Sequence, residues 1–322
     1  MKKEASLILT IVLGLGAVVL LAHWLDDHRE DMNARSSEER LYLDSATAKR
    51  LTFAFNGLAA DWYWMSSLQY VGRKIVNYED AHDGRFNLND LSSLDLHLLP
   101  SLLRVTTTLD PQFMAPYEYG AVILPELNRD DAIALLNYGI AANPSSWRLY
   151  QHLGYIYWQS KDYSRASDVY AAGAKLPGAP AWMAALSARM KAEGGSRYAA
   201  GQMYHRLYES SSDESVKQMV DKQLSRLDYL DERDVIRRVL EAFKARNGRC
   251  VSSWREVDDE LRAVRIGISQ LNDPSDDNQL KGYHTFYIDA GGAPRDPSGV
   301  PYRLTAGGCD VDLDENTKVP KR

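Results

Sequence analysis

The sequence predicts a mostly α-helical protein with an N-terminal transmembrane helix, an α-solenoid of short helical repeats and a small α+β domain at the C-terminus. Three observations lead to this fold class. An apolar run covers residues 5–25, helix-sized apolar patterns recur at a fixed period within 113–214, and strand and turn signals replace helical periodicity after residue 248. A chain of 322 residues is long enough to hold several such parts.

Composition narrows the class of partner. The net charge is −6, charges of both signs are mixed along the chain, and no basic block is present. This argues against nucleic acid as a partner. The chain has 19 Tyr and seven Trp against six Phe, a bias toward amphipathic aromatic residues. These rings either pack the repeats against one another or line a groove that binds peptide, and the composition leaves both readings open.

The apolar run at 5–25 is long enough to cross a bilayer. Lys2 and Lys3 precede it, while Asp26 and Asp27 follow it, so we expect the N-terminus in the cytoplasm and the rest of the chain outside. Trp24 then suits the membrane interface. The prediction is an uncleaved anchor, 1–25, in the bacterial cytoplasmic (inner) membrane, with the bulk of the chain in the periplasm.

A cleaved signal peptide is the alternative for this run. The residues Leu20-Leu21-Ala22 lack the small residue that a peptidase needs three positions before the cut. Apolar residues also continue well past Gly14 and Gly16, where a cut would fit better. We therefore favour the anchor.

Residues 26–112 connect the anchor to the repeats. The polar residues 26–44 are predicted to form a juxtamembrane spacer, and the pattern becomes helical from 45 to about 78, followed by a polar loop at 79–89. A second helix, 91–109, is interrupted or started at Pro100. We interpret 45–112 as a diverged leading repeat that caps the array. Its first helix carries one apolar stripe, made up of Leu51, Phe55, Leu58, Trp62 and Met65.

The centre of the chain, 147–177, has the pattern of two short helices joined by a tight turn near Lys161 and Asp162. Small residues at helical spacing leave room for a neighbouring helix, and tyrosines fill the gaps between helices. The small residues are Gly154, Ala166 and Gly173, and the tyrosines are Tyr150, Tyr157 and Tyr170. Such a unit cannot bury its apolar face alone, so we expect copies on either side.

These copies occur at a period of 34 residues. Upstream they include Gly120, Ala132, Leu136 and Gly139, and downstream Ala188, Ala200, Tyr204 and Leu207. The pattern resembles the tetratricopeptide repeat (TPR) family, with its W-x2-L-G-x2-Y…A-x3-F…P signature. The middle repeat matches best, with Tyr150 and Tyr170 in place of the Trp and Phe. The first repeat has Pro116 at the Trp position, and the third lacks Leu-Gly and the closing proline. The resemblance covers about 113–214.

The TPR resemblance implies a binding groove, because the first helix of each pair lines the concave face of the array. The implied groove residues are Met114, Tyr117, Arg148, Gln151, Tyr155, Trp158, Gln159, Trp182 and Arg189. Aromatic rings beside arginines and an amide suit an extended peptide or a helix of a partner protein. Alternatively, the leading helix or the C-terminal domain folds back and fills the groove.

After the repeats, 215–247 is predicted as a helical extension of one or two helices, which Gly248 ends with a left-handed cap. The last part, 248–322, is predicted to be a small α+β domain. Its strand-like segment 282–288 precedes a D-P-x-G-x-P-Y turn at 296–302. The region 235–314 resembles the end of a type II secretion pseudopilin, in which such a turn joins a long helix to a small sheet. The methylated pilin N-terminus is absent.

The pseudopilin resemblance implies that Cys250 and Cys309 face each other across one small domain. An extracytoplasmic compartment permits a disulfide bond between them. Such a bond would close a loop of about 60 residues and contribute roughly 4 kcal/mol of stability by the loop-entropy estimate. The alternative is two unpaired, partly buried thiols.

We find no enzyme signature. The seven histidines are scattered, and there is no His-x3-His or Cys-x2-Cys pair, so we expect no metal site. No glycine-rich phosphate loop occurs, and we expect no cofactor. The segment Asp310-x-Asp312-x-Asp314 begins like a calcium loop but lacks its later glycine and acid, and suits a solvated tail better.

The predicted function is a non-catalytic scaffold or adaptor that binds protein partners in the bacterial cell envelope. The alternative is an accessory subunit of a secretion or type IV pilus-like machine that docks pilin-type partners. The sequence identifies neither the partner nor the pathway.

Overall fold

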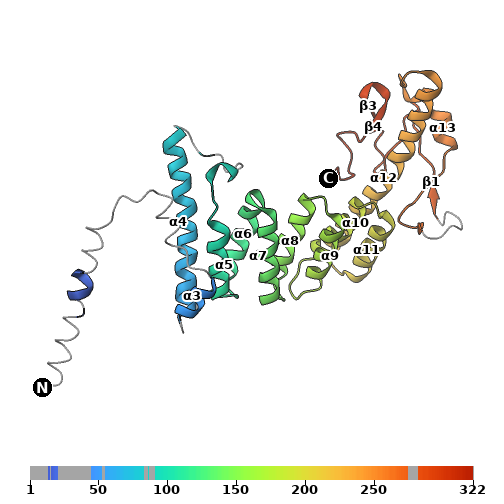
Figure 1. Cartoon of the computed structure of the whole chain (residues 1–322). Helices are drawn as coiled ribbons and strands as arrows, with labels where there is room; N and C mark the ends of the chain where they lie inside the picture. Colours follow the sequence, from blue (N-terminus) through green and yellow to red (C-terminus); the bar gives the residue numbers. More distant parts are fainter. Residues whose placement is uncertain are drawn as a thin grey trace, which may run out of the picture. The chain divides into compact units, whose positions relative to one another are not determined.

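A computed structural model describes residues 14, 16–20, 45–52, 55–82, 86, 91–274 and 282–321. These residues are mostly helical, with a small sheet component (Figure 1). The predicted spacer, 26–44, and nearly all of the predicted membrane span, 5–25, lie outside these ranges. Among the described residues, no helix combines the length and the apolar character that crossing a membrane requires.

The chain forms two compact units, Met1–Asp110 and Pro111–Arg322. The first contains α3 (Ser45–Leu51), α4 (Asn56–His82), the 3-10 helix η1 (Leu91–Leu94) and α5 (Leu99–Leu109). Pro100 lies in the first turn of α5, where its missing N–H costs nothing, as expected. Helix α4 extends to His82, so the predicted loop begins four residues later than the sequence suggested.

The single helix predicted from residue 45 to about 78 is two helices, α3 and α4, with a bend at Thr52. The apolar stripe therefore spans both helices, and it is not a buried face. Leu51, Phe55, Leu58, Trp62 and Met65 are all exposed in the described structure. Helix α4 instead buries a neighbouring face that includes Ala60, Tyr63 and Tyr70. The Tyr70 hydroxyl donates to the carbonyl of Asp95 at 3.1 Å, which ties α4 to the segment before α5.

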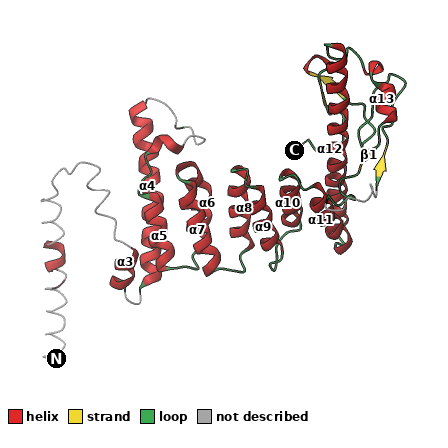
Figure 2. Ribbon diagram, turned by 45° about the vertical axis from the view of Figure 1, so that its right-hand side comes forward, coloured by secondary structure: helices red, strands yellow, loops and turns green. Residues whose placement is uncertain are grey.

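The second unit begins with three antiparallel helix pairs, which follow one another in chain order (Figures 1 and 2). They are α6 (Met114–Leu127) with α7 (Arg129–Ala142), α8 (Trp147–Gln159) with α9 (Tyr163–Ala174), and α10 (Trp182–Glu193) with α11 (Arg197–Ser210). The helix pair predicted for 147–177 is thus confirmed.

The turns inside the last two pairs are equivalent. Lys161 has φ 59° and Gly195, 34 residues later, has φ 93°, so both take the left-handed conformation that closes a tight turn. The side chain of Asp162 then accepts a hydrogen bond from the backbone N–H of Arg165 at 3.1 Å and caps α9. The period seen in the sequence is therefore also a period in backbone conformation.

The small residues of the repeats lie at the predicted close contacts. A Cβ atom added at Gly154 would lie 2.9 Å from the ring of Tyr170, and one at Gly139 would lie 2.7 Å from the ring of Tyr117. Both glycines are thus required by a tyrosine from the other helix of the same pair.

Helix α12 (Glu214–Asn247) is a single helix, and Gly248 ends it at φ 70° as predicted. Its first half packs Val220 and Leu227 against the last helix pair. Its second half packs Ile236, Leu240 and other apolar residues into the core of the C-terminal domain. One helix therefore connects the repeats to the small domain (Figure 2).

The C-terminal domain contains short elements around α12. These are η2 (Trp254–Glu256), α13 (Asp258–Ala263), β1 (Ile266–Gly267), β2 (Tyr283–His284), β3 (Arg303–Thr305), η3 (Ala306–Gly308) and β4 (Asp310–Asp312). Strands β1 and β2 form one antiparallel pair, and β3 and β4 form another.

The strand predicted at 282–288 is shorter than expected. Its only ladder residues are Tyr283 and His284, and Ile288 makes an isolated bridge to Pro294. The Asp289 carboxylate accepts the backbone N–H groups of Gly291 and Ala293, which turns the chain directly after that bridge. The predicted 296–302 turn is present: buried Asp296 accepts the N–H groups of Ser298 and Val300.

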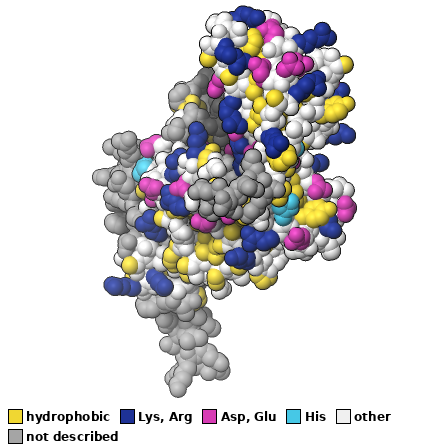
Figure 3. Space-filling view, turned by 90° about the vertical axis from the view of Figure 1, so that its right-hand side faces the viewer, with side chains coloured by type: hydrophobic (Ala, Val, Ile, Leu, Met, Phe, Trp, Pro, Cys, Tyr) yellow, Lys and Arg dark blue, Asp and Glu magenta, His cyan; other side chains and the backbone are white. Residues whose placement is uncertain are grey.

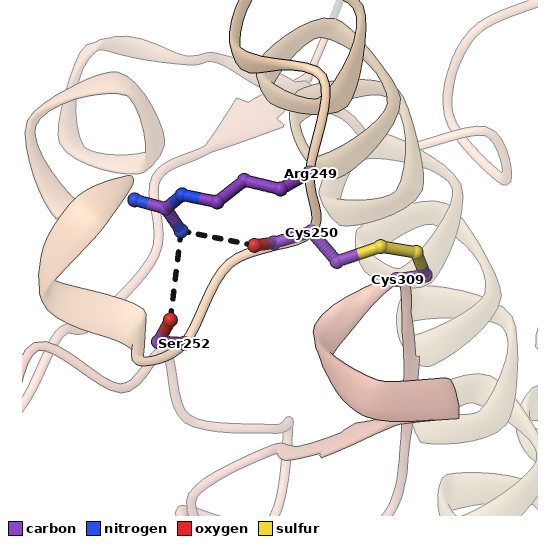
Figure 4. The surroundings of a disulfide bond; sticks show 4 residues. All are labelled: Arg249, Cys250, Ser252 and Cys309. Atoms are coloured by element: carbon purple, nitrogen blue, oxygen red, sulfur yellow. Dashed lines mark hydrogen bonds between the residues drawn. A yellow bond between two sulfur atoms is a disulfide. The ribbon is translucent and has the colours of Figure 1, made fainter.

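The predicted disulfide bond between Cys250 and Cys309 is confirmed. It joins the loop after α12 to the residue that follows η3, with the two Cα atoms 5.0 Å apart (Figure 4). The Arg249 guanidinium donates to the Cys250 carbonyl at 3.1 Å and lies 3.5 Å from the Ser252 hydroxyl. The bond thus links the loop at the start of the small domain to the residue directly before β4.

Candidate binding groove

Four of the predicted groove residues form a continuous row on α8 and α10, which we call the aromatic strip: Tyr155, Trp158, Gln159 and Arg189. The Gln159 side chain donates to the Tyr155 hydroxyl at 3.0 Å. The rings of Tyr155 and Trp158 meet edge to face with centroids 5.8 Å apart. The guanidinium of Arg189 lies 5.3 Å from the centroid of the Trp158 ring. A cation–π contact thus joins two successive repeats.

A second cluster lies at the N-terminal ends of the same two helices. Trp147 and Trp182 meet edge to face at 6.0 Å, and the Arg148 guanidinium lies 5.0 Å from the Trp147 ring. The sequence analysis predicted Arg148 and Trp182 but missed Trp147. Its signal was a large aromatic residue directly before a predicted groove arginine, at the first position of the helix.

Both clusters are accessible in the described structure. Tyr155 is 45% exposed, and Arg148 and Gln159 are also exposed. The remaining groove residues except Tyr117 are half-buried: Met114 on α6, Gln151 and Trp158 on α8, and Trp182 and Arg189 on α10. Half-buried rings with one free face are held in place and still offer contact area.

Tyr117 is a correction, because it is a core residue. Its side chain is fully buried and packs over Gly139, and its hydroxyl donates to the carbonyl of Pro111 at 3.1 Å. In the middle pair the equivalent glycine is Gly173, and a Cβ added there would lie 2.7 Å from the Cβ of Tyr150, which is also on the first helix of its pair. Tyr117 lies one position later in the register than Tyr150, so in the first pair the bulky residue over the glycine falls on a predicted groove position.

The last repeat is partly covered by the protein's own chain. Arg226 of α12 reaches Glu193 of α10 at 3.2 Å, and Arg189 lies 3.7 Å from the same carboxylate. The covering residue belongs to α12, in the predicted helical extension 215–247, and not to either of the two parts that the sequence analysis named as filling the groove. The sequence analysis missed Arg226 and Arg233. Their spacing of seven residues, which places them on one face of a predicted helix, was the available signal.

Two electrostatic features bear on this surface. Burial lowers the pKa of His152 on α8, and the charge of Glu118 on α6 partly offsets this, so the imidazole is neutral near pH 7. Figure 3 shows one face of the molecule, on which acidic and basic side chains are interspersed with apolar ones. Recognition of a partner on that face would thus depend on local clusters of side chains.

Within the described ranges, no group of three or more His, Cys, Asp or Glu residues could hold a metal ion.

No protein-family model matches the chain, and no curated protein matches it. The class of protein that the fold defines is a helical-repeat protein with a disulfide-bonded C-terminal domain.

Proposed function

We propose that this chain is a TPR-type scaffold that holds a protein partner in its groove. It is anchored by its N-terminal helix on the outer face of the bacterial cytoplasmic membrane and has no catalytic role. The observation that carries this function is the aromatic strip: exposed Tyr155 beside half-buried Trp158, with Arg189 over the Trp158 ring. Tyr, Trp and Arg are the residue types that dominate the binding energy of protein interfaces.

The strip favours a partner segment that lies across the repeats. Tyr155, Trp158 and Gln159 come from α8, and Arg189 comes from α10. An extended peptide or a helix that crosses both helices contacts an aromatic face, an amide and a cation in succession. The exposed apolar stripe of the first unit supports the same class of function, since contiguous exposed apolar surface usually marks an interaction site.

Membership of the TPR family is supported by the 34-residue register, the paired helices and the equivalent left-handed turns at Lys161 and Gly195. The C-terminal domain supports a second candidate, an accessory subunit that docks pilin-type partners. There the end of α12, the turn at Asp296 and the short sheet follow the order expected from the pseudopilin resemblance.

The test of the scaffold function is the double variant Arg148→Ala/Trp158→Ala in the full chain, extracted in mild detergent. Captured proteins are identified by pull-down and mass spectrometry, and melting is measured on the same preparation. We expect partner capture to weaken by well over tenfold, since anchors of these types often cost about 2 kcal/mol or more each. Stability should fall by only about 1 kcal/mol, because neither side chain is fully buried.

A matched control is available on another surface. Tyr208 is exposed, and Lys217 lies 5.4 Å from the centroid of its ring. The variant Tyr208→Ala/Lys217→Ala removes the same kinds of side chain away from the strip and should leave capture unchanged. If the groove variant captures the partner as well as the control variant does, the groove is not the interface. A loss of several kcal/mol of stability in the first variant would mean that the strip is packed against the protein's own chain.

A further inference from the structure

A small cavity between α10 and α12 is lined by three arginines, and we call it the arginine pocket. Its volume is about 140 Å³. Arg189 comes from α10, and Arg226 and Arg233 come from α12. The other lining residues are Ala192, Glu193, Tyr204, Gln223, Leu227 and Leu230. Because a water molecule occupies about 30 Å³ in the liquid, the pocket has room for a small polyatomic ion.

The three arginines are largely removed from solvent. Their side chains are 20% exposed for Arg189, 14% for Arg226 and 26% for Arg233. Burial lowers the pKa of Arg226, and the positive charge of Arg189 lowers it further, while Glu193 partly offsets both effects. These cations are therefore close enough to repel one another.

Acidic partners are too few to balance these cations. Within the described part of the chain, Glu193 is the one acid that lines the pocket, and it is shared by Arg226 at 3.2 Å and Arg189 at 3.7 Å. Asp234 lies 3.6 Å from Arg233 and 2.6 Å from Arg197, and Arg197 is also paired with Asp231 at 2.8 Å. At the pocket and its edge, four arginines thus face three carboxylates, which leaves an excess of one positive charge.

Hydrogen bonding is incomplete as well. The Nε atoms of Arg189 and Arg233 are buried and have no hydrogen-bond partner among the described residues. A buried N–H group that lacks an acceptor is costly, because its desolvation is not compensated. Two such N–H groups at one pocket leave donors free for an acceptor that the described chain does not supply.

The pocket adjoins a wider cavity of about 750 Å³, which shares Ala192, Glu193, Leu230 and Arg233 with it. The wider cavity is also lined by Arg197 and by Ser269, whose buried hydroxyl oxygen has no partner among the described residues. A ligand thus has a route to the arginines, and a group attached to the ion has space outside the pocket.

We propose that the arginine pocket binds an oxyanion of the phosphate class. Guanidinium groups bind phosphate through paired hydrogen bonds, and the excess of positive charge at the pocket favours an anion. The ion comes either free or as the terminal phosphate of an ester whose remainder occupies the wider cavity. The pocket shares Arg189 with the partner groove, and its other two arginines lie outside that groove.

The test is calorimetric titration of the full-length protein in detergent with sodium phosphate, above neutral pH, where phosphate is mainly divalent. Chloride keeps the ionic strength constant. We expect saturable binding and a phosphate-dependent rise in melting temperature. Arg189→Gln and Arg226→Gln should each weaken binding by about tenfold or more, because a hydrogen bond to a charged group is lost. Each variant relieves repulsion but also removes a contact, of Arg226 with Glu193 or of Arg189 with the Trp158 ring, so the melting temperature of each variant without phosphate is its own baseline.

Arg206→Gln is the matched control, since Arg206 is exposed on α11 and outside the pocket. It should bind phosphate like the wild type. Arg226→Lys keeps the charge but not the paired geometry and provides a second variant if Arg226→Gln does not fold. Phenyl phosphate distinguishes the sources: tighter binding than inorganic phosphate indicates an ester, and equal or weaker binding indicates the free ion.

Three results would overturn the assignment. The first is no saturable phosphate binding by the wild type, which needs no variant. The second is undiminished binding by the Arg189 and Arg226 variants. The third is an equal effect of acetate, which would show that a single negative charge suffices.

Discussion

Glu232 of α12 and His284 of β2 lie 52 residues apart in the sequence, and their carboxylate oxygen and imidazole Nε2 are 2.8 Å apart in the structure. The Tyr302 hydroxyl donates to the second oxygen of the same carboxylate at 2.6 Å. Glu232 is almost fully buried, so these two contacts supply the partners that a buried carboxylate requires. The Glu232 carboxylate thus connects α12 to β2 through His284 and to the residue before β3 through Tyr302.

This contact predicts that stability depends on pH. The hydrogen bond that protonated His284 donates to the Glu232 carboxylate raises the pKa of His284 above its ordinary value of 6.5; burial opposes this, and the charges of Glu232, Asp228 and Asp231 add to it. Because the pKa of His284 is higher in the folded than in the unfolded state, the stabilisation that its protonated form provides is complete below pH 6.5. This stabilisation is lost as the pH rises through the folded-state pKa of His284. The melting temperature of the wild type should therefore fall in this range relative to that of His284→Gln.

Asp228 changes stability at lower pH. Burial raises the pKa of Asp228 to about 6, so stability falls as the pH rises from its ordinary pKa of 3.8 to about 6 and stays lower above that. The charge of His284 lowers the pKa of Asp228, so His284→Gln changes the ionisation of Asp228 as well, and the two proteins are compared from pH 6.5 upward. Parallel melting profiles of the two proteins from pH 6.5 upward would contradict a role for His284.

Gly154→Leu should destabilise the repeats. The Tyr170 ring lies 2.9 Å from where its Cβ would be, so a side chain here overpacks the pair α8 and α9 and costs about 1–3 kcal/mol or more. Ala172→Leu places the same side chain at an exposed position of α9 and should change stability little. Thermal melting of the two variants measures the difference, and equal melting temperatures would contradict this packing.

Removal of the disulfide should destabilise the small domain. The bond joins residues 59 apart, and Cys250→Ala/Cys309→Ala should cost roughly 4 kcal/mol by the loop-entropy estimate. Denaturant unfolding with and without a reducing agent measures this. The reducing agent should lower the stability of the wild type and leave the double variant unchanged. If it has no effect on the wild type, the cysteines are not bonded in solution.

Membrane topology can be tested by fusion of alkaline phosphatase to the C-terminus, since that reporter needs an oxidising compartment. The paired lysines before the apolar run predict an active fusion. A fluorescent cytoplasmic reporter at the same site should be dark. The opposite pair of results would place the C-terminal domain in the cytoplasm.

The sequence alone was sufficient for features set by local or periodic constraints. A tight turn needs a left-handed residue and a capping side chain, which appear at Lys161 and Asp162. Gly248 was recognisable as a helix end for the same reason. Gly154 was recognisable as a close contact because its position recurs every 34 residues. Of the groove, Tyr155 and Trp158 followed from the TPR resemblance, and both lie on α8.

Only the tertiary structure decided which faces meet. The burial of Tyr117 depends on which position of the first helix lies over Gly139, and the exposure of the apolar stripe depends on which face of α4 packs against α5. The encounter of Arg189 with Arg226 and the contact of Glu232 with Tyr302 bring together residues 37 and 70 positions apart. The 34-residue period does not predict these contacts. They depend on how α12 packs against the last helix pair on one side and the C-terminal domain on the other.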